Sequence, residues 1–245
     1  MTRFFAVPPL AAALIAMPAA AQEVPSGGFD LSGRVELVSD YRYRGISRTD
    51  VGIAVQPTLT IDHDSGLYLG AWGSNLDDGP AFGDVELNIY GGYETQVAPG
   101  TRLDVGLTYY LHPDGDRAFG PSDYGEASAR LSYMLGPLEA TGRVAYAWDQ
   151  AALGGDDSLY LNLGLSAGLP ATPVTLAASV GYTDGALAAL APRGHYFDWS
   201  LGARATFGSL TAGVRYVDTD IAKTRVRALD KLYRPTVVLS LGLVF

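Results

Sequence analysis

The 245-residue sequence contains no cysteine and fewer basic than acidic residues. Without cysteine, the chain can form neither a disulfide scaffold nor a cysteine-ligated zinc site. Its 17 lysines and arginines against 26 aspartates and glutamates give a net charge of −9, which argues against a nucleic-acid partner. The three histidines, His63, His112 and His195, lack metal-motif spacing, so we expect no metal ion and no cofactor.

Long apolar runs are also scarce. Residues 4–16 are apolar, but Pro8 and Pro9 interrupt them and Ala19-Ala20-Ala21 follows. A short apolar run after a single arginine, ending at an Ala-x-Ala sequence, is typical of a signal peptide and not of a spanning helix. We therefore predict a cleaved signal peptide at residues 1–21 and one exported domain at residues 22–245.

What the sequence has instead is strand-forming alternation, together with 30 glycines and 15 tyrosines. Phe29, Leu31 and Val35 alternate with polar residues, so that one face of the segment is apolar and the other charged. The same period of two recurs to the end of the chain, which predicts an all-β fold of about twelve strands. They begin near residues 29, 55, 66, 84, 102, 126, 138, 159, 174, 197, 210 and 237.

Charged side chains fall on the polar face of these segments and not on the apolar face. Continued through Asp40-Tyr41-Arg42-Tyr43-Arg44, the parity of the first strand places both tyrosines on the apolar face and the charged residues on the polar face. If the polar face encloses a lumen, these residues are candidates to line a pore: Arg34, Glu36, Asp40, Arg42, Arg44, Glu86, Arg102, Asp104, Glu126, Arg130, Glu139, Arg143, Asp198, Arg204 and Arg215.

The lengths of the connections alternate and indicate which face meets water. Longer connections are expected at residues 45–53, 75–83, 112–123, 149–157, 183–196 and 217–234, and shorter ones at 64–66, 95–100, 136–137, 170–173 and 208–209. Such alternation is typical of a transmembrane antiparallel up-and-down β-barrel with short periplasmic turns, six longer extracellular loops and both termini periplasmic. The main competitor is a soluble Greek-key sandwich, which gives no reason for the alternation.

Aromatic residues and the last residue fit a membrane barrel. Aromatics near predicted strand ends would form girdles at the membrane surfaces: Tyr41, Tyr43, Tyr109, Tyr133, Trp148, Tyr182, Phe197 and Phe207. The final strand ends at Phe245, which resembles the terminal signal by which outer-membrane barrels are recognised. We therefore expect outer-membrane lipid, lipopolysaccharide and the barrel-assembly machinery as partners.

Residues 31–110 carry a family resemblance. The run from Val38 to Ser47, VSDYRYRGIS, resembles the N-terminal signature of the proteobacterial TorF porin family, as do Gln56-Pro57, residues 66–75 and residues 86–93. The resemblance implies an outer-membrane location and a channel, and it implies no catalytic residues and no substrate. Beyond residue 110 only the general barrel pattern continues.

A porin-like channel for passive diffusion of small polar solutes is the function we predict, and net acidity favours a mild preference for cations. A non-conducting anchor or surface-interaction barrel is one alternative. A barrel-embedded lipid-modifying enzyme is another, but Ser74-Asn75 has no nearby histidine, and His195 and Ser200 differ in parity. We therefore predict no enzyme activity. The basic residues near Lys231 would bind lipopolysaccharide phosphates or fold into the lumen.

Overall fold

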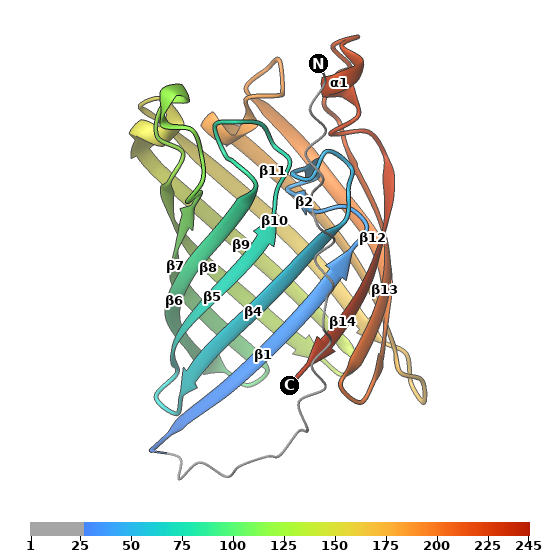
Figure 1. Cartoon of the computed structure of the whole chain (residues 1–245). Helices are drawn as coiled ribbons and strands as arrows, with labels where there is room; N and C mark the ends of the chain where they lie inside the picture. The colour runs from blue at the N-terminus through green and yellow to red at the C-terminus, as the bar shows by residue number, and fades with distance from the viewer. Residues whose placement is uncertain (1–26) are drawn as a thin grey trace, which may run out of the picture.

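A computed structural model describes residues 27–245, so the predicted signal peptide at residues 1–21 lies outside the described residues. Twelve antiparallel strands form a closed barrel (Figure 1). They are β1 (Phe29–Val38), β4 (Ala54–His63), β5 (Leu67–Asn75), β6 (Val85–Ala98), β7 (Thr101–Leu111), β8 (Tyr124–Leu135), β9 (Leu138–Gln150), β10 (Asp156–Gly168), β11 (Val174–Gly185), β12 (His195–Phe207), β13 (Leu210–Thr219) and β14 (Thr236–Val244).

Each barrel strand pairs with its neighbours in the chain, and the first and last strands close the ring. In the closing pair, Arg34 lies opposite Val244 and Val38 opposite Ser240. Gly33 and Phe245 exchange two backbone hydrogen bonds of 2.8 and 2.9 Å. Closure leaves no unpaired edge, which is the arrangement that a β-structure in lipid requires. The predicted all-β up-and-down barrel is confirmed.

The two ends of the barrel differ, and we name them the turn end and the loop end. At the turn end, where β1 begins and β14 ends, the connections are residues 64–66, 99–100, 136–137, 169–173 and 208–209. At the loop end they are residues 39–53, 76–84, 112–123, 151–155, 186–194 and 220–235. The predicted alternation is present, although β9 and β10 extend further than expected and leave only five residues between them.

Short helical turns occur in four of the loops: η1 (Arg117–Phe119), η2 (Ala151–Leu153), η3 (Ala186–Ala188) and α1 (Arg227–Asp230). Among residues 27–245, none of the helices has the length and apolarity needed to cross a membrane.

Alternation along the strands gives the barrel an apolar outside and a polar inside. Outward residues such as Leu31, Leu163 and Leu241 are largely exposed, as expected of side chains placed to contact lipid. Inward charges from strands that are not neighbours contact each other in the lumen. Arg204 on β12 lies 3.4 Å from Glu36 on β1, although β13 and β14 lie between these two strands in the ring. The predicted separation of charged and apolar faces is therefore present.

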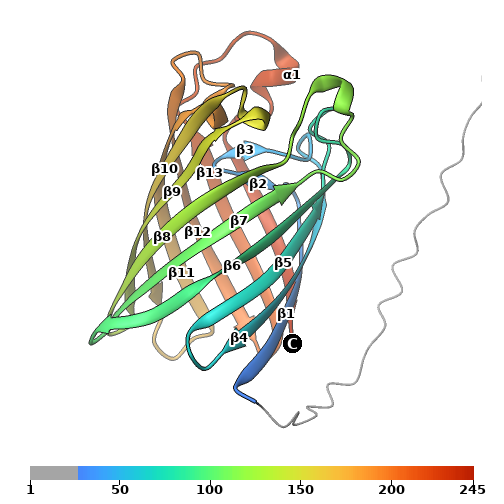
Figure 2. The same ribbon diagram turned by 90° about the vertical axis from the view of Figure 1, so that its left-hand side faces the viewer.

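The first strand ends earlier than the alternation predicts. β1 stops at Val38, and the chain then turns into the barrel as a two-stranded hairpin, β2 (Arg42–Tyr43) and β3 (Ile46–Ser47). Figures 1 and 2 show β2 and β3 inside the barrel wall, towards the loop end. The expectation that Tyr41 and Tyr43 face lipid was wrong, because both side chains lie inside the barrel against β6 and β7.

Candidate functional site

Residues 39–53, which we call the inner hairpin, lie across the loop-end half of the lumen. The turn between β2 and β3 consists of Arg44 (φ 49°) and Gly45 (φ 86°). Two successive positive φ angles are typical of the tightest β-hairpin turns. Gly45 also lacks room for a side chain, since a Cβ there would lie 2.5 Å from Thr219 Cγ2 and 3.0 Å from Asp198 Cβ.

An ion pair between Asp40 and Arg42 fixes the start of the inner hairpin. The Arg42 Nε atom donates to Asp40 Oδ2 at 2.7 Å, and Ser47 Oγ donates to Asp40 Oδ1 at 2.6 Å. Arg42 further donates to the Arg234 carbonyl oxygen (3.1 Å) and to Thr236 Oγ1 (2.9 Å). Both charged side chains are buried, so these hydrogen bonds offset the cost of removing them from water. Asp40 thereby turns the chain inward directly after β1.

The tip of the inner hairpin contacts the opposite side of the barrel. The Arg44 guanidinium pairs with Glu126 on β8 and lies 4.3 Å from the centre of the Tyr160 ring on β10. In the ring of strands, β8 and β10 lie on the side opposite β1, from which the hairpin starts. Tyr196 on β12 donates to the Arg44 carbonyl oxygen at 3.0 Å. The hairpin therefore spans the lumen from one wall to the other.

Tyrosines fill the space between the inner hairpin and the wall. Tyr41 donates to Glu86 on β6 at 3.2 Å, and Tyr43 donates to Tyr110 on β7 at 3.3 Å. The Tyr110 ring stacks on that of Tyr124, with ring centres 4.5 Å apart. These buried rings and hydroxyls anchor the hairpin by packing as well as by charge.

Arg48 joins the inner hairpin to two other loops. Its guanidinium lies 2.6 Å from Asp78 and 4.5 Å from the centre of the Phe82 ring, both in residues 76–84. It also lies 3.4 Å from His112 Nε2 in residues 112–123. Because arginine can only donate, Nε2 is the accepting nitrogen and Nδ1 carries the proton. Burial, reinforced by Arg48, lowers the pKa of His112 below its ordinary value.

The sequence-predicted lining residues divide into two groups. Six are buried around the inner hairpin: Asp40, Arg42, Arg44, Glu86, Glu126 and Asp198. The other nine lie on the inner faces of strands that continue toward the turn end: Arg34, Glu36, Arg102, Asp104, Arg130, Glu139, Arg143, Arg204 and Arg215. The first group holds the hairpin, and the second borders the wider part of the lumen.

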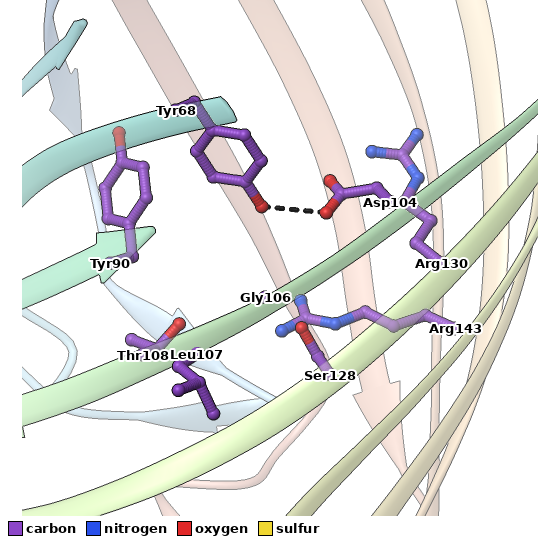
Figure 3. Close-up of a pocket in the computed structure, with 9 residues that line it drawn as sticks. All are labelled: Tyr68, Tyr90, Asp104, Gly106, Leu107, Thr108, Ser128, Arg130 and Arg143. Atoms are coloured by element: carbon purple, nitrogen blue, oxygen red, sulfur yellow. Dashed lines mark hydrogen bonds between the residues drawn. The ribbon is translucent and has the colours of Figure 1, made fainter. Parts of the chain in front are cut away.

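A cavity of about 170 Å³ lies in this wider part, between the walls formed by β5 to β9 (Figure 3). Its lining includes Arg130, Arg143 and Ser128 on one side and Tyr68, Tyr90 and Thr108 on the other. A second cavity of about 450 Å³ continues toward Asp62 and Glu94 and shares Tyr68, Tyr90 and Asp104 with the first. Together they form one space in the turn-end half.

Glycines let the two tyrosines of the cavity lie flat against the wall. A Cβ at Gly92 would lie 2.5 Å from the Tyr68 hydroxyl oxygen, and one at Gly70 would lie 2.4 Å from the Tyr90 ring. The hydroxyls are fixed by Asp104, which accepts from Tyr68 at 2.7 Å, and by Thr60, whose hydroxyl lies 2.6 Å from that of Tyr90. Sequence reasoning missed both tyrosines and Arg48, although the alternating Gly-Tyr pattern of residues 66–73 and 90–93 could have indicated rings packed on glycines.

In the described part of the chain, His195 and Ser200 are not placed to act together. His195 and Ser200, five residues apart on β12, lie on opposite faces of the strand, and Ser200 Oγ lies 2.8 Å from Ser179 Oγ. Within residues 27–245, no group of three or more histidines, aspartates and glutamates has the geometry to hold a metal ion.

The closed twelve-stranded barrel with a charged lumen and an apolar exterior is of the kind found in outer-membrane porins. Residues 22–245 match the sequence profile of a family described as bacterial protein of unknown function (Gcw_chp), and the chain belongs to this family. A comparison with curated proteins finds no match.

Solved structures give the same fold at low sequence identity. A NanC porin superposes with a TM-score of 0.57 at 12% identity, covering 88% of this chain and 98% of that chain. A KdgM porin, solved in complex with disordered oligogalacturonate, gives 0.57 at 7% identity, covering 88% and 97%. An outer membrane channel from Pseudomonas putida F1 gives 0.51 at 12% identity, covering 88% and 95%. At these identities the similarity concerns the fold.

Proposed function

We propose that the chain forms a narrow channel in the bacterial outer membrane, through which small polar solutes diffuse passively. The observation that carries the proposal is the combination of a charged, hollow turn-end half with an inner hairpin that constricts the loop-end half. A barrel that served only as an anchor would have no need of water-accessible arginines along its lumen. The resemblance of Val38–Ser47 to the TorF porin family, and the porin names of two similar structures, support a conducting barrel.

The constriction determines what such a channel would pass. Because the inner hairpin reaches from β1 to β8, solutes would have to pass beside it through gaps between its side chains and the wall. Pore width and the charges at the narrowest point set the selectivity of channels. We therefore propose a small conductance and an upper size limit set by the hairpin and not by the ring of strands.

In this proposal the barrel sits with its turn end in the periplasm and its loop end outside the cell, after export by the N-terminal signal peptide. Outer-membrane lipid would contact the apolar exterior, and the barrel-assembly machinery would recognise the strand that ends at Phe245. Lys223, Arg225 and Arg227 are exposed at the loop end, where lipopolysaccharide phosphates would lie.

A sealed barrel, acting as an anchor or a surface-interaction protein, is the second candidate. It is favoured by the burial of Asp40, Arg42, Arg44 and Ser47, which shows that the inner hairpin is packed and not loosely held. Within residues 27–245, no cavity or cluster of charged residues indicates a protein partner for such a barrel. A sealed barrel and a narrow channel make different predictions for ion current.

Purified protein in planar lipid bilayers tests the proposal. We expect discrete current steps in potassium chloride from the wild type, and larger steps from a variant in which residues 41–51 are replaced by a short glycine-serine linker. Steps from the linker variant alone would establish the sealed barrel and overturn the channel. Circular dichroism and the resistance of folded barrels to unheated SDS would verify that both proteins are folded.

A further inference from the structure

We infer that the cavity in the turn-end half is a binding site for a small hydroxylated carboxylate, such as a sugar acid, with Arg130 and Arg143 as its anion-binding pair. The inference rests on the proposed channel for its biological sense, since it names the class of solute that the lumen would hold. It concerns binding, however, and is tested separately from conduction.

The two arginines lie side by side and are accessible from the lumen. Arg130 on β8 lies directly opposite Arg143 on β9 in the strand register, and both side chains line the cavity. Their side chains are 51% and 41% exposed, so water or a solute can reach them. Like charges placed directly opposite each other destabilise a sheet. A bound anion would relieve this repulsion.

Glu139 and Glu126 form loose ion pairs with the two arginines and leave their hydrogen-bond donors unused. Glu139 lies 3.8 Å from Arg130, and Glu126 lies 3.6 Å from Arg143 while it also pairs with Arg44 of the inner hairpin. Within residues 27–245, no protein acceptor is within hydrogen-bonding geometry of either guanidinium. Guanidinium groups with free donors match the two oxygens of a carboxylate.

The remaining lining explains why the ligand should be hydroxylated and singly charged. Ser128, Thr108 and the Tyr90 hydroxyl supply groups that can exchange hydrogen bonds with alcohols, and the Tyr68 and Tyr90 rings supply flat apolar surface. Asp104 adds one negative charge, but its Oδ1 atom accepts from Tyr68. With Glu139 and Glu126 also within 4 Å of the arginines, the charge of the pair is already partly offset, which suits a singly charged carboxylate better than a phosphate ester carrying about two negative charges.

The arrangement of the lining supports binding from the turn end. In Figure 3 the arginines extend toward the cavity from one side, with Arg130 next to Asp104 and Arg143 next to Ser128, while the tyrosines face them from β5 and β6. The cavity opens into the larger space bordered by Asp62 and Glu94. A solute can therefore reach the site without passing the inner hairpin.

Ligand-observed NMR on the detergent-solubilised barrel tests the site. D-glucuronate and D-glucose are the probes, because they share a ring and differ in the carboxylate. We expect saturation transfer to glucuronate, with an affinity at least tenfold higher than for glucose. Arg130→Gln combined with Arg143→Gln should weaken glucuronate binding at least tenfold, since hydrogen bonds between two charged groups are stronger than those between neutral groups. Asp104→Asn should strengthen it.

Arg102→Gln is the matched control. Arg102 is also inward-facing and 61% exposed, but it lies on β7 outside the cavity lining and pairs with Glu94 at 3.4 Å. Equal binding of glucose and glucuronate, or an equal loss in Arg102→Gln, would overturn the site. The binding result is independent of conduction. If the barrel binds glucuronate but carries no current, the binding site is supported and the channel is overturned. If it conducts but binds glucose and glucuronate equally, the channel is supported and the binding site is overturned.

Discussion

Arg44 and Glu126 form an ion pair that joins the tip of the inner hairpin to the far wall of the barrel. They come from strands on opposite sides of the ring, because Arg44 follows β1 and Glu126 lies on β8. Both side chains are buried, and Tyr110 on β7 also faces Glu126. This pair therefore holds the tip of the hairpin against the far wall.

Replacing Glu126 should be more damaging than replacing Arg44. Arg44→Gln leaves Glu126 with Arg143 at 3.6 Å, whereas Glu126→Gln leaves Arg44 with no carboxylate among the salt bridges of residues 27–245. An uncompensated buried charge costs about 3–5 kcal/mol. We expect Glu126→Gln to lower the free energy of unfolding by that amount and Arg44→Gln by less, as measured by denaturant titration in micelles.

The double variant Arg44→Gln/Glu126→Gln completes this comparison, because it removes both charges together. We expect it to be more stable than Glu126→Gln alone, which would give a coupling energy between the two sites. Single-channel conductance should rise in all three variants as the hairpin loosens. Strict additivity of the two single effects would contradict the pairing.

Gly45→Ala should displace the hairpin through a steric clash as well as backbone strain. Gly208 provides the matched control, because it also has a positive φ, of 60°, but nothing lies within 4 Å of a Cβ there. Strain at such positions costs about 1–3 kcal/mol. We expect both variants to lose stability and only Gly45→Ala to change the conductance. Unchanged conductance in Gly45→Ala would mean that the tip does not set the pore width.

The ion pair at the exposed part of the hairpin should matter much less. Lys231 Nζ lies 2.6 Å from Asp50 Oδ2, but the two side chains are 36% and 38% exposed. Pairs of this kind contribute about 0–1 kcal/mol and are screened by salt. Asp50→Asn should therefore change the unfolding free energy by less than about 1 kcal/mol. A larger change that persists in 1 M salt, where the Debye length falls to about 3 Å, would contradict this expectation.

His112 gives the loop packing a pH dependence. Its pKa is lowered by burial and by Arg48, so the folded protein keeps the ring neutral at a pH where the unfolded chain binds a proton. The contribution of His112 to stability is complete above its ordinary pKa of 6.5 and is lost as the pH falls below that value. We expect the stability difference between wild type and His112→Asn to be smaller at about pH 5 than at about pH 7.5. Equal differences at the two pH values would show that the ring does not titrate in this way.

The barrel could be predicted from the sequence because its determinants are local. A period of two fixes which side chains share a face, and turn residues such as Gly136-Pro137 mark the strand ends. The hairpin could not be predicted in the same way. The alternation continues from Glu36 through Arg44, and only contacts with distant residues, such as Arg42 with Thr236, show that the chain has left the wall.

The net charge of the chain and the arginine pair of the cavity lead to different expectations for ion selectivity. Acidic residues such as Asp77, Asp114 and Asp156 lie in the loops or at strand ends near the loop end, whereas exposed arginines border the turn-end cavity. Whole-chain acidity favours cations, and the arginine pair favours anions. The reversal potential in a salt gradient distinguishes these two expectations, because only the second requires the selectivity to change in the Arg130→Gln/Arg143→Gln variant.

The orientation of the two faces can be tested with one lysine on each side of β10. Leu163 points outward and is 66% exposed, whereas Ser166 points inward and lies 3.4 Å from Glu139. A lysine on the lipid face near the membrane centre costs about 2–4 kcal/mol. One at position 166 would remain in the hydrated lumen and could pair with Glu139. We therefore expect Leu163→Lys to reduce the unfolding free energy in lipid vesicles by about 2–4 kcal/mol and Ser166→Lys to leave it nearly unchanged. A similar cost for both would mean that the apolar face does not contact lipid, and a soluble all-β fold would then have to be reconsidered.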